Sequence, residues 1–296
     1  MKRIEHTIRS KDALIFRIIT MLFLAVFSVF ILYPILYILA ASVSDAVSVE
    51  TGRVLLLPKN IHWESYRQAL AIPNFWRSYG NSLYYTLLGT AVNMLFTTTA
   101  AYALAQKGLP FRRFLIILLV FTMWFDPGII ARFLNFKEYG LLNTRASILI
   151  GFVVDTYNLI ILRSFFEGMP ESLNEAAALD GCNQWQVFTK IYLPLSKSAI
   201  ATVSLFYIVS RWNGYFWAKI LLNNERDMPL QVLLTKLVVQ KNTGSEATAM
   251  IIGERLTSPQ TVIYAVIVLS ALPMMVLYPF ISKYFKQGVT VGAIKE

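Results

Sequence analysis

Long apolar runs constrain the fold of this chain more than any other feature of its sequence. A helix needs about 20 apolar residues to cross the hydrocarbon core of a membrane, and six runs reach or approach that length. Only 15% of the residues are charged, whereas about a quarter are charged in soluble domains. The sequence therefore predicts an all-α, polytopic membrane protein with six transmembrane helices, at Ile18–Ala41, Ser82–Ala105, Phe114–Ile130, Ser147–Phe166, Ile200–Leu222 and Gln260–Tyr284.

Basic residues at the N-terminus predict how these helices are oriented in the membrane. Lys2, Arg3, Arg9 and Lys11 precede the first apolar run, and such residues favour the cytoplasmic side. The run itself is too long to be the apolar region of a signal peptide. We expect both termini in the cytoplasm and one transmembrane domain, with residues 1–296 as the domain, 82–284 as its core, 167–197 as a cytoplasmic loop and 285–296 as a cytoplasmic tail.

The sequence lacks the residue patterns of several other functions. Cys182 is the single cysteine, and the two histidines, His6 and His62, do not make a credible metal site. No pair of glycines has the spacing of a phosphate-binding P-loop, and no nucleic-acid-binding motif accompanies the net charge of +10. We therefore expect no catalytic residue and no cofactor on this chain, so that any ATP and Mg²⁺ would bind to another subunit.

A polar segment between the fourth and fifth apolar runs has the features of two short helices. Ser172 and Glu175 have the spacing of a capping box at the start of the first helix. Gly181 stands where a left-handed residue is expected to end that helix. Asn183 can cap the second helix, and Gln186 occupies the third position after this cap. The spacing thus predicts a helix–turn–helix in the aqueous loop.

The two predicted helices differ in the surfaces that they offer. The second carries an aromatic and apolar flank, which can pack on neighbouring spans before Pro194 ends the helix, at Trp185, Phe188, Ile191 and Tyr192. The first presents mainly alanines, and small side chains allow the surface of another protein to approach closely. The segment is therefore interpreted as a docking element, with a re-entrant linker or an interfacial helix as the alternative.

The same segment resembles a motif of ABC-importer permease subunits, EAA-x3-G-x9-I-x-LP. Every fixed position is matched at the right spacing, by Glu175-Ala176-Ala177, Gly181, Ile191 and Leu193-Pro194. "NLIILRSFFEGMPESLNEAAALDG" is similar to the permeases for carbohydrate uptake. "FTMWFDPGIIARFLNFKEYGLLNT", "LLLPKNIHWESY" and "KYFKQGVTVGAIKE" are similar to a Gram-positive-type oligosaccharide branch, so the resemblance covers nearly the whole chain. Asp126-Pro127-Gly128 and Asp155 depart from the pattern of that branch.

The resemblance implies a bacterial cell-membrane protein that works with several other chains. The expected partners are a second permease subunit, with which it would form a heterodimer, an ATPase dimer at the cytoplasmic face, and an extracellular or periplasmic solute-binding protein. The helix before Gly181 would be the coupling helix, which lies in a cleft of the ATPase. Its docking residues would be Glu175, Ala176, Ala177, Asp180 and Gly181, and the tail Gly288–Glu296 would reach the ATPase dimer interface.

Three charged residues fall within the predicted spans, namely Asp126, Asp155 and Arg211. Such residues usually face the interior of a helix bundle or a water-filled cavity. One interpretation is a structural ion pair between Asp155 and Arg211, which are each near the middle of a span. The other interpretation is that these residues form the polar wall of a translocation path.

The fifth predicted span favours a path nearby. Tyr207, Arg211 and Tyr215 are four residues apart and would share one helix face, with Asn213 and Trp217 on a neighbouring stripe. Aromatic rings suit the CH faces of sugars, amides and guanidinium groups suit hydroxyls, and arginine can bind a carboxylate in a bidentate fork. The alternative is that the aromatic residues only pack helices together or lie at the membrane interface.

These observations lead to one main functional hypothesis and one competing class. The chain is expected to be the permease subunit of an ATP-driven ABC importer, which moves an oligosaccharide, with a uronate-containing one proposed, from the solute-binding protein into the cytoplasm. The competing class is an ion-coupled secondary transporter or a membrane enzyme that uses the intramembrane carboxylates. The sequence does not identify the sugar.

Overall fold

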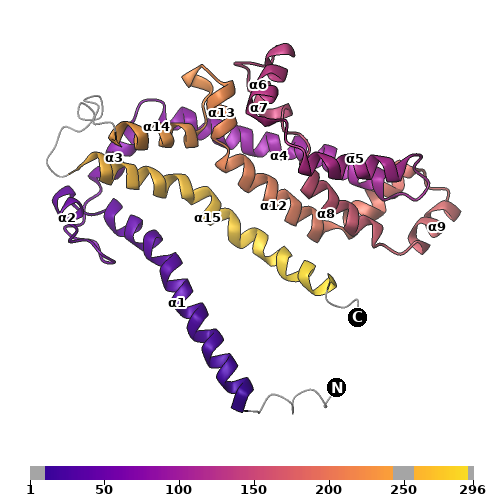
Figure 1. Ribbon diagram of the computed structural model, residues 1–296, viewed down its shortest axis with the longest axis horizontal. Coiled ribbons are helices and arrows are strands. Elements are labelled where there is room, and N and C mark those ends of the chain that lie inside the picture. Colours follow the sequence, from indigo (N-terminus) through magenta and orange to yellow (C-terminus); the bar gives the residue numbers. More distant parts are fainter. Residues whose placement is uncertain (1–10, 243–256, 293–296) are drawn as a thin grey trace. The chain divides into compact units, whose positions relative to one another are not determined.

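The computed structural model describes residues 11–242 and 257–292, and within them it contains helices and loops but no strand (Figure 1). The all-α prediction is therefore confirmed. The basic cluster at residues 2–9 and residues 293–296 lie outside the described residues, so the cytoplasmic position of the termini stays a prediction. The chain divides into two compact units, Met1–Ile72 with Leu237–Leu269, and Pro73–Lys236 with Ser270–Glu296; these are called unit 1 and unit 2.

Unit 1 holds the most apolar helix of the chain. Its elements are α1 (Lys11–Ser42), α2 (Ala46–Glu50), α3 (Glu64–Ala71), the last residues of α14 (Leu230–Asn242) and the first part of α15 (Pro259–Gly292). The C-terminal end of α1 joins a small core, where the rings of Tyr37 and Tyr264 meet edge to face at 5.9 Å. Most other side chains of α1 are apolar and exposed, which is typical of a helix whose surroundings are lipid or another apolar surface.

Unit 2 contains the remaining elements. They are α4 (Phe75–Ala105), α5 (Arg112–Trp124), α6 (Gly128–Glu138), α7 (Arg145–Ile150), α8 (Thr156–Glu167), α9 (Ser172–Leu179), α10 (Gln184–Val187), η1 (Phe188–Tyr192), α11 (Leu193–Leu195), α12 (Lys197–Asn213), α13 (Phe216–Leu221), η2 (Glu225–Asp227), most of α14 and the rest of α15. Within this unit, α9 lies at one end of α8 and α12, and α6, α7 and α13 lie at the other end (Figure 1).

Helix α4 is the element on which unit 2 is assembled, because α8 and α12 both pack along it. Its buried face carries small side chains at spacings of three and four residues, namely Ser78, Ser82, Thr86, Gly89, Thr90, Asn93, Thr97 and Ala101. In membranes, small residues let helix backbones approach closely, and their hydroxyl and amide groups can bond across the interface. The sequence of α4 therefore explains why this apolar helix forms the centre of the unit.

The structure resolves the predicted spans into unbroken and broken helices. Within the described residues, three helices are long and apolar enough to cross a membrane, namely Ala13–Ser42, Phe75–Ala105 and Pro259–Pro279. They correspond to the first, second and sixth predicted runs. Two bent pairs pass the same test together, α5 with α6 at 117° and Gln184–Leu195 with α12 at 82°. The count of six spans stays a prediction.

The third, fourth and fifth predicted runs are interrupted rather than continuous. The third turns at Phe125–Pro127, where Gly128 adopts a φ of +80° and donates its amide to Asp126 Oδ1 at 2.9 Å. The fourth is divided into α7 and α8 by residues 151–155, and the fifth into α12 and α13 at Gly214. A proline and a glycine with positive φ cannot continue a helix, which accounts for the first of these breaks.

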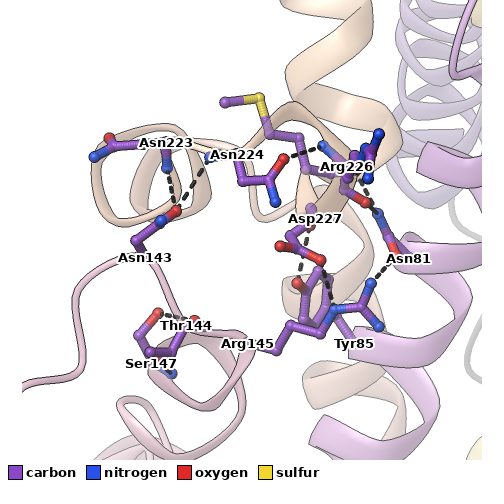
Figure 2. A network of polar contacts seen from close by, with 11 residues as sticks. Asn81, Tyr85, Asn143, Thr144, Arg145, Ser147, Asn223, Asn224, Arg226 and Asp227 are labelled. Carbon is purple, nitrogen blue, oxygen red and sulfur yellow. Dashed lines mark hydrogen bonds and ion pairs between the residues drawn. The ribbon is translucent and has the colours of Figure 1, made fainter.

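A network of polar contacts holds the segment between α13 and α14 (Figure 2). Asn81 of α4 donates to the carbonyls of Arg226 at 2.8 Å and Met228 at 3.1 Å, and Tyr85 donates to the carbonyl of Asp227 at 2.9 Å. Arg145 bonds Asp227 Oδ1 at 2.7 Å, and this hydrogen bond raises the pKa of the guanidinium above its ordinary value.

Asn143 completes the network from the loop before α7, because its side-chain oxygen accepts the amides of Asn223 at 3.0 Å and Asn224 at 3.1 Å (Figure 2). The carbonyls and amides of this segment, which contains the short helix η2, thus find partners on α4 and beside α7. This network ties the segment to α4 and to the start of α7.

We expect Asn81→Ala to loosen the segment between α13 and α14. The change leaves two backbone carbonyls without their donor, which costs about 1–3 kcal/mol for buried groups. The purified complex should unfold at a lower temperature, and trypsin should cleave faster after Arg226. Thr99→Ala is the matched control, because the Thr99 hydroxyl bonds only carbonyls of its own helix. Equal cleavage of the two variants would contradict the proposed tether.

Candidate functional site

The candidate site is a cavity of about 1380 Å³ inside unit 2. It lies where the third, fourth and fifth predicted spans are interrupted. Its lining includes residues 151–155 between α7 and α8, and residues 213–217, which run from the end of α12 into the start of α13. Non-helical backbone at membrane depth is tolerated only where it is buried in protein or lines a water-filled cavity. The cavity therefore accounts for how the helix breaks are tolerated, and the breaks account for the space that the cavity occupies.

All six residues that the sequence predicts for a translocation path line this cavity, namely Asp155, Tyr207, Arg211, Asn213, Tyr215 and Trp217. The structure separates them into two groups. Asp155, Tyr207 and Arg211 use their polar atoms within the protein. Asn213 ends α12, and Tyr215 and Trp217 follow it. These three residues leave polar or aromatic surface in the cavity, since Asn213 and Tyr215 are exposed and Trp217 is half-buried.

Arg211 holds the C-terminal end of α7. Its guanidinium donates to the carbonyls of Ile148, Leu149 (3.1 Å) and Phe152 (3.0 Å). These carbonyls lack helical partners because α7 ends at residue 150, and a cation at the C-terminus of a helix also interacts favourably with the helix dipole. Arg211 is therefore a structural clamp on the break in the fourth predicted span.

Helix α4 positions this clamp. Asn93 Oδ1 accepts two hydrogen bonds from Arg211, at 2.6 Å and 3.2 Å, and Asn93 Nδ2 donates to the carbonyl of Phe152 at 2.9 Å. A Cβ atom on Gly89, one turn away, would lie 3.0 Å from Arg211 Nε. Glycine at position 89 thus leaves the room in which the guanidinium lies. The sequence analysis missed Asn93, although an amide within an apolar run is a signal for a bond across helices.

Of the two interpretations of the intramembrane charges, the ion pair between Asp155 and Arg211 is wrong, because the salt bridges of the described residues do not include it. Asp155 is instead the N-cap of α8, where its Oδ1 accepts the amide of Asn158 at 2.9 Å. The amide of Asp155 donates to the Tyr207 hydroxyl at 3.0 Å, and this hydroxyl also bonds Thr97 at 2.7 Å. The Tyr207 side chain is buried, and its hydroxyl supports the helix break.

Arg132 of α6 is a cation in the cavity lining that the sequence analysis did not select. Its guanidinium carbon lies 5.8 Å from the centre of the Trp217 ring, and one of its nitrogens lies 3.3 Å from Asp126 Oδ1. Trp217 is itself packed against Phe152, with ring centres 5.6 Å apart. The sequence marks Asp126 as an intramembrane charge, and its partner Arg132 lies just beyond the end of the third predicted span.

The helix–turn–helix between α8 and α12 is the second candidate site. Gly181 has a φ of +71°, as the sequence predicts, and Asn183 forms a capping box with Gln186 at the start of α10. The predicted capping box of Ser172 and Glu175 is wrong, because no side chain caps α9 and the amide of Glu175 donates to the Glu171 carbonyl at 3.2 Å. Ser172 is already the first residue of α9, so it cannot serve as its cap.

The aromatic flank of the second helix packs as expected, with one exception. Phe188 and Tyr192 are buried against Tyr102 of α4, at ring-centre distances of 5.0 Å and 4.9 Å, whereas Trp185 remains exposed. The helix continues through Pro194 to Leu195 by way of the π-helical turn η1, and then bends into α12. A π-helical turn accommodates a proline because a regular hydrogen bond is already absent there.

Helix α9 presents most of the predicted docking residues to the outside. Ala177 is buried in the core of unit 2, and Asn174 Nδ2 bonds the Tyr192 hydroxyl at 3.0 Å. Glu175, Ala176, Asp180 and Gly181 are exposed, and Leu179 is 89% exposed. The buried contacts hold α9 in place, while an acidic, small and apolar surface remains open for another protein.

Comparisons with known proteins agree over nearly the whole chain. The family profile described as "Binding-protein-dependent transport system inner membrane component" matches residues 9–291. The polygalacturonan/rhamnogalacturonan transport system permease protein YtcP of Bacillus subtilis (strain 168) is 38% identical over 274 residues, which cover 92% of this chain and 96% of that protein. Protein LplC of the same organism is 35% identical over 292 residues, with 98% of each chain covered.

A solved structure is also similar. It is described as the crystal structure of a bacterial ABC transporter involved in the import of the acidic polysaccharide alginate. The TM-score is 0.87 at 41% sequence identity, and the match covers 93% of this chain and 98% of the other. The likeness therefore extends to sequence as well as fold.

We expect Arg211→Gln to destabilise the protein without any compensation from Asp155→Asn. Loss of the clamp leaves carbonyls unpaired, at about 1–3 kcal/mol, whereas asparagine caps a helix about as well as aspartate does. The double variant should show the sum of the two single effects within about 0.5 kcal/mol. Unfolding temperature and yield of the assembled complex provide the measurement. Recovery of either in the double variant would instead indicate a coupled charge pair.

Proposed function

The chain belongs to the binding-protein-dependent transport system inner membrane components, and we propose that the cavity in unit 2 is its path for an acidic oligosaccharide. The protein is the permease subunit of an ABC importer for oligosaccharides in the bacterial plasma membrane, and it is not an enzyme. As such, it works with a second permease, an ATPase and a binding protein. ATP and Mg²⁺ would bind to the ATPase subunits, and the second permease would be a different chain.

The observation that carries the proposed path is the meeting of three interrupted helices around one cavity. Transporters place their substrate sites at discontinuous helices, because the freed backbone groups and the adjoining side chains can face water there. Asn213, Tyr215 and the half-buried Trp217 combine an amide with aromatic faces in the cavity lining. This combination suits a sugar, whose hydroxyls form hydrogen bonds and whose CH faces stack on rings.

An acidic substrate is supported by the charges of the lining and by the relatives. The cavity lining contains two arginines, Arg132 and Arg211, and one aspartate, Asp155. The hydrogen-bond partners of Arg211 are neutral carbonyls and the amide of Asn93, so its positive charge is not cancelled by them. A relative is named for polygalacturonan and rhamnogalacturonan, and the similar solved structure belongs to an alginate importer.

The exposed face of α9 is proposed to dock to the ATPase at the cytoplasmic side. Glu175 does not cap its own helix, so its carboxylate is available for a basic residue of the partner, and Ala176, Asp180 and Gly181 adjoin it. Ala177, which is buried, would hold α9 against the core of unit 2.

In this proposal residues 1–296 are one transmembrane domain with a core at 82–284. The docking loop is 167–197, and the tail at 285–296 also reaches the ATPase. Residues 285–292 are helical as the end of α15, and the rest of that tail lies outside the described residues.

An ion-coupled carrier would need an intramembrane carboxylate that takes up and releases protons during transport. Asp155 is committed to the N-terminus of α8, and Asp126 bonds the Gly128 amide at a helix bend. These structural roles favour the ATP-driven importer over the ion-coupled alternative.

We expect proteoliposomes with the complete complex to take up a labelled oligogalacturonide only when ATP and the loaded binding protein are present. The purified chain alone should hydrolyse no ATP, because it has no phosphate-binding loop. Asp155→Asn is the matched control, since it removes the carboxylate but keeps a capping side chain. Uptake driven by a proton gradient without ATP, and lost in Asp155→Asn, would support the ion-coupled alternative instead.

We expect Gly181→Val to uncouple ATP hydrolysis from uptake. A Cβ atom at this position would meet no other atom within 4 Å, so the effect comes from the left-handed backbone, which costs a non-glycine residue about 1–2 kcal/mol. Uptake per ATP hydrolysed should fall several-fold, while the complex still assembles.

Gly108→Val is the control for this substitution, because Gly108 also has open space around it but no positive φ. Normal uptake per ATP in Gly181→Val would contradict a coupling role for the bend.

A further inference from the structure

We propose that Arg132, held against the face of Trp217, is the subsite that binds the carboxylate of an acidic sugar in the cavity. In this inference the substrate carboxylate replaces Asp126 as the partner of the guanidinium. The inference rests on the proposed function and adds to it the residue that distinguishes acidic from neutral oligosaccharides.

The first step is the difference between the two arginines of the cavity. Arg211 donates to three carbonyls and to Asn93 through all three of its nitrogens. A substrate carboxylate could bind it in a fork only by releasing the backbone of the helix break. Arg132 makes one ion-pair contact, through a single nitrogen, and its side chain is 39% exposed. Arg132 is therefore the arginine whose hydrogen-bond donors a ligand can reach.

The second step is that Trp217 holds the guanidinium in place. The guanidinium carbon of Arg132 lies 5.8 Å from the ring centre, and an arginine over a tryptophan face is attracted by the ring quadrupole. The Trp217 ring is packed against Phe136, Phe152 and Phe216, with centres 6.4, 5.6 and 5.5 Å away. A ring fixed in this way restricts the guanidinium, so less freedom is lost when a carboxylate binds.

The third step is the weakness of the present partner. The Asp126 side chain is 70% exposed and its contact with Arg132 measures 3.3 Å. Exposed ion pairs of this kind contribute little to stability. The same Asp126 oxygen accepts the Gly128 amide, so the aspartate has a role at the bend between α5 and α6 without Arg132. A bidentate carboxylate of the substrate can therefore compete with it.

The charges in the cavity lining favour an anion, and Asp126, which lies outside that lining, is the counter-charge that the substrate carboxylate would replace. Of the ionised side chains in the cavity lining, Arg132 and Arg211 are positive and Asp155 is negative, and an Asp155 oxygen accepts the Asn158 amide at the start of α8. Trp217 adjoins Arg132, and Tyr215 and Phe216 line the same cavity, so a uronate can place its carboxylate on the guanidinium and its ring CH groups on an aromatic face.

The test uses the complete complex in proteoliposomes with binding protein that is saturated either with an oligogalacturonide or with its neutral methyl ester. Uptake rates are normalised to the amount of assembled complex. Arg132→Gln should lower uptake of the acid roughly tenfold, the size expected for losing a charge-assisted, bidentate contact. Uptake of the ester should change by less than about twofold, because the ester cannot use that contact. Arg132→Lys should lie between, since lysine keeps the charge but not the fork.

Two further variants complete the design. Lys137→Gln removes the same charge from the same helix α6, at an exposed side chain outside the cavity lining, and should leave both rates unchanged. Asp126→Asn keeps an oxygen for the Gly128 amide but removes the competing charge, so uptake of the acid should stay equal or rise. This last comparison requires only the acidic substrate.

The outcomes separate this inference from the proposed function. If the wild-type complex takes up no oligogalacturonide with ATP and binding protein, the proposed substrate class is wrong. If the wild-type complex is active but Arg132→Gln lowers acid and ester uptake equally, or leaves acid uptake unchanged, the carboxylate subsite is overturned. A loss of acid uptake in Asp126→Asn as large as in Arg132→Gln would also overturn it, because the ion pair itself would then be what transport needs.

Discussion

The structure of unit 2 depends on how the backbone groups at its helix breaks find partners. In a membrane, an unpaired carbonyl or amide costs several kcal/mol, because no water replaces the missing bond. At the break between α7 and α8, Arg211 and Asn93 bind the freed carbonyls, and Asp155 and Tyr207 bind the freed amides. These partners allow the fourth predicted span to be interrupted, and the interruption allows a cavity.

The same interactions determine the electrostatic potential in the cavity. Arg211 is bonded to neutral groups, so it keeps its charge beside the cavity while its donors are occupied. Arg132 has the opposite arrangement, with a counter-ion that is exposed and a tryptophan face that positions it. Arg211 therefore stabilises the helix break and contributes positive electrostatic potential to the cavity, whereas Arg132 supplies hydrogen-bond donors that a ligand can use. This division follows from packing around α4, where Gly89 leaves space for Arg211.

Two helices connect the cavity with α9, the proposed docking element. α8 begins at the Asp155 cap and ends beside the segment that leads to α9, and α12 runs from the bend after α11 to the break at Gly214 (Figure 1). Both pack along α4. Continuous, packed helices thus lead from α9 to the residues that line the cavity, and the proposed coupling could be transmitted along them.

The sequence by itself determined the features that depend on neighbouring residues or on solvent. Long apolar runs must be helical in lipid, because a helix satisfies its own backbone, and the left-handed Gly181 and the Asn183–Gln186 cap are set by residues within a few positions. The motif around Glu175 also identified the family.

Tertiary structure decided which polar groups meet across the chain. Asn93 lies 118 positions before Arg211, and no spacing rule could show that Arg211 binds carbonyls rather than Asp155, or that Arg132 lies over Trp217. Such partners depend on how helices that are far apart in the sequence pack together. The spacing of residues along one helix shows only which of those residues lie on the same face of that helix.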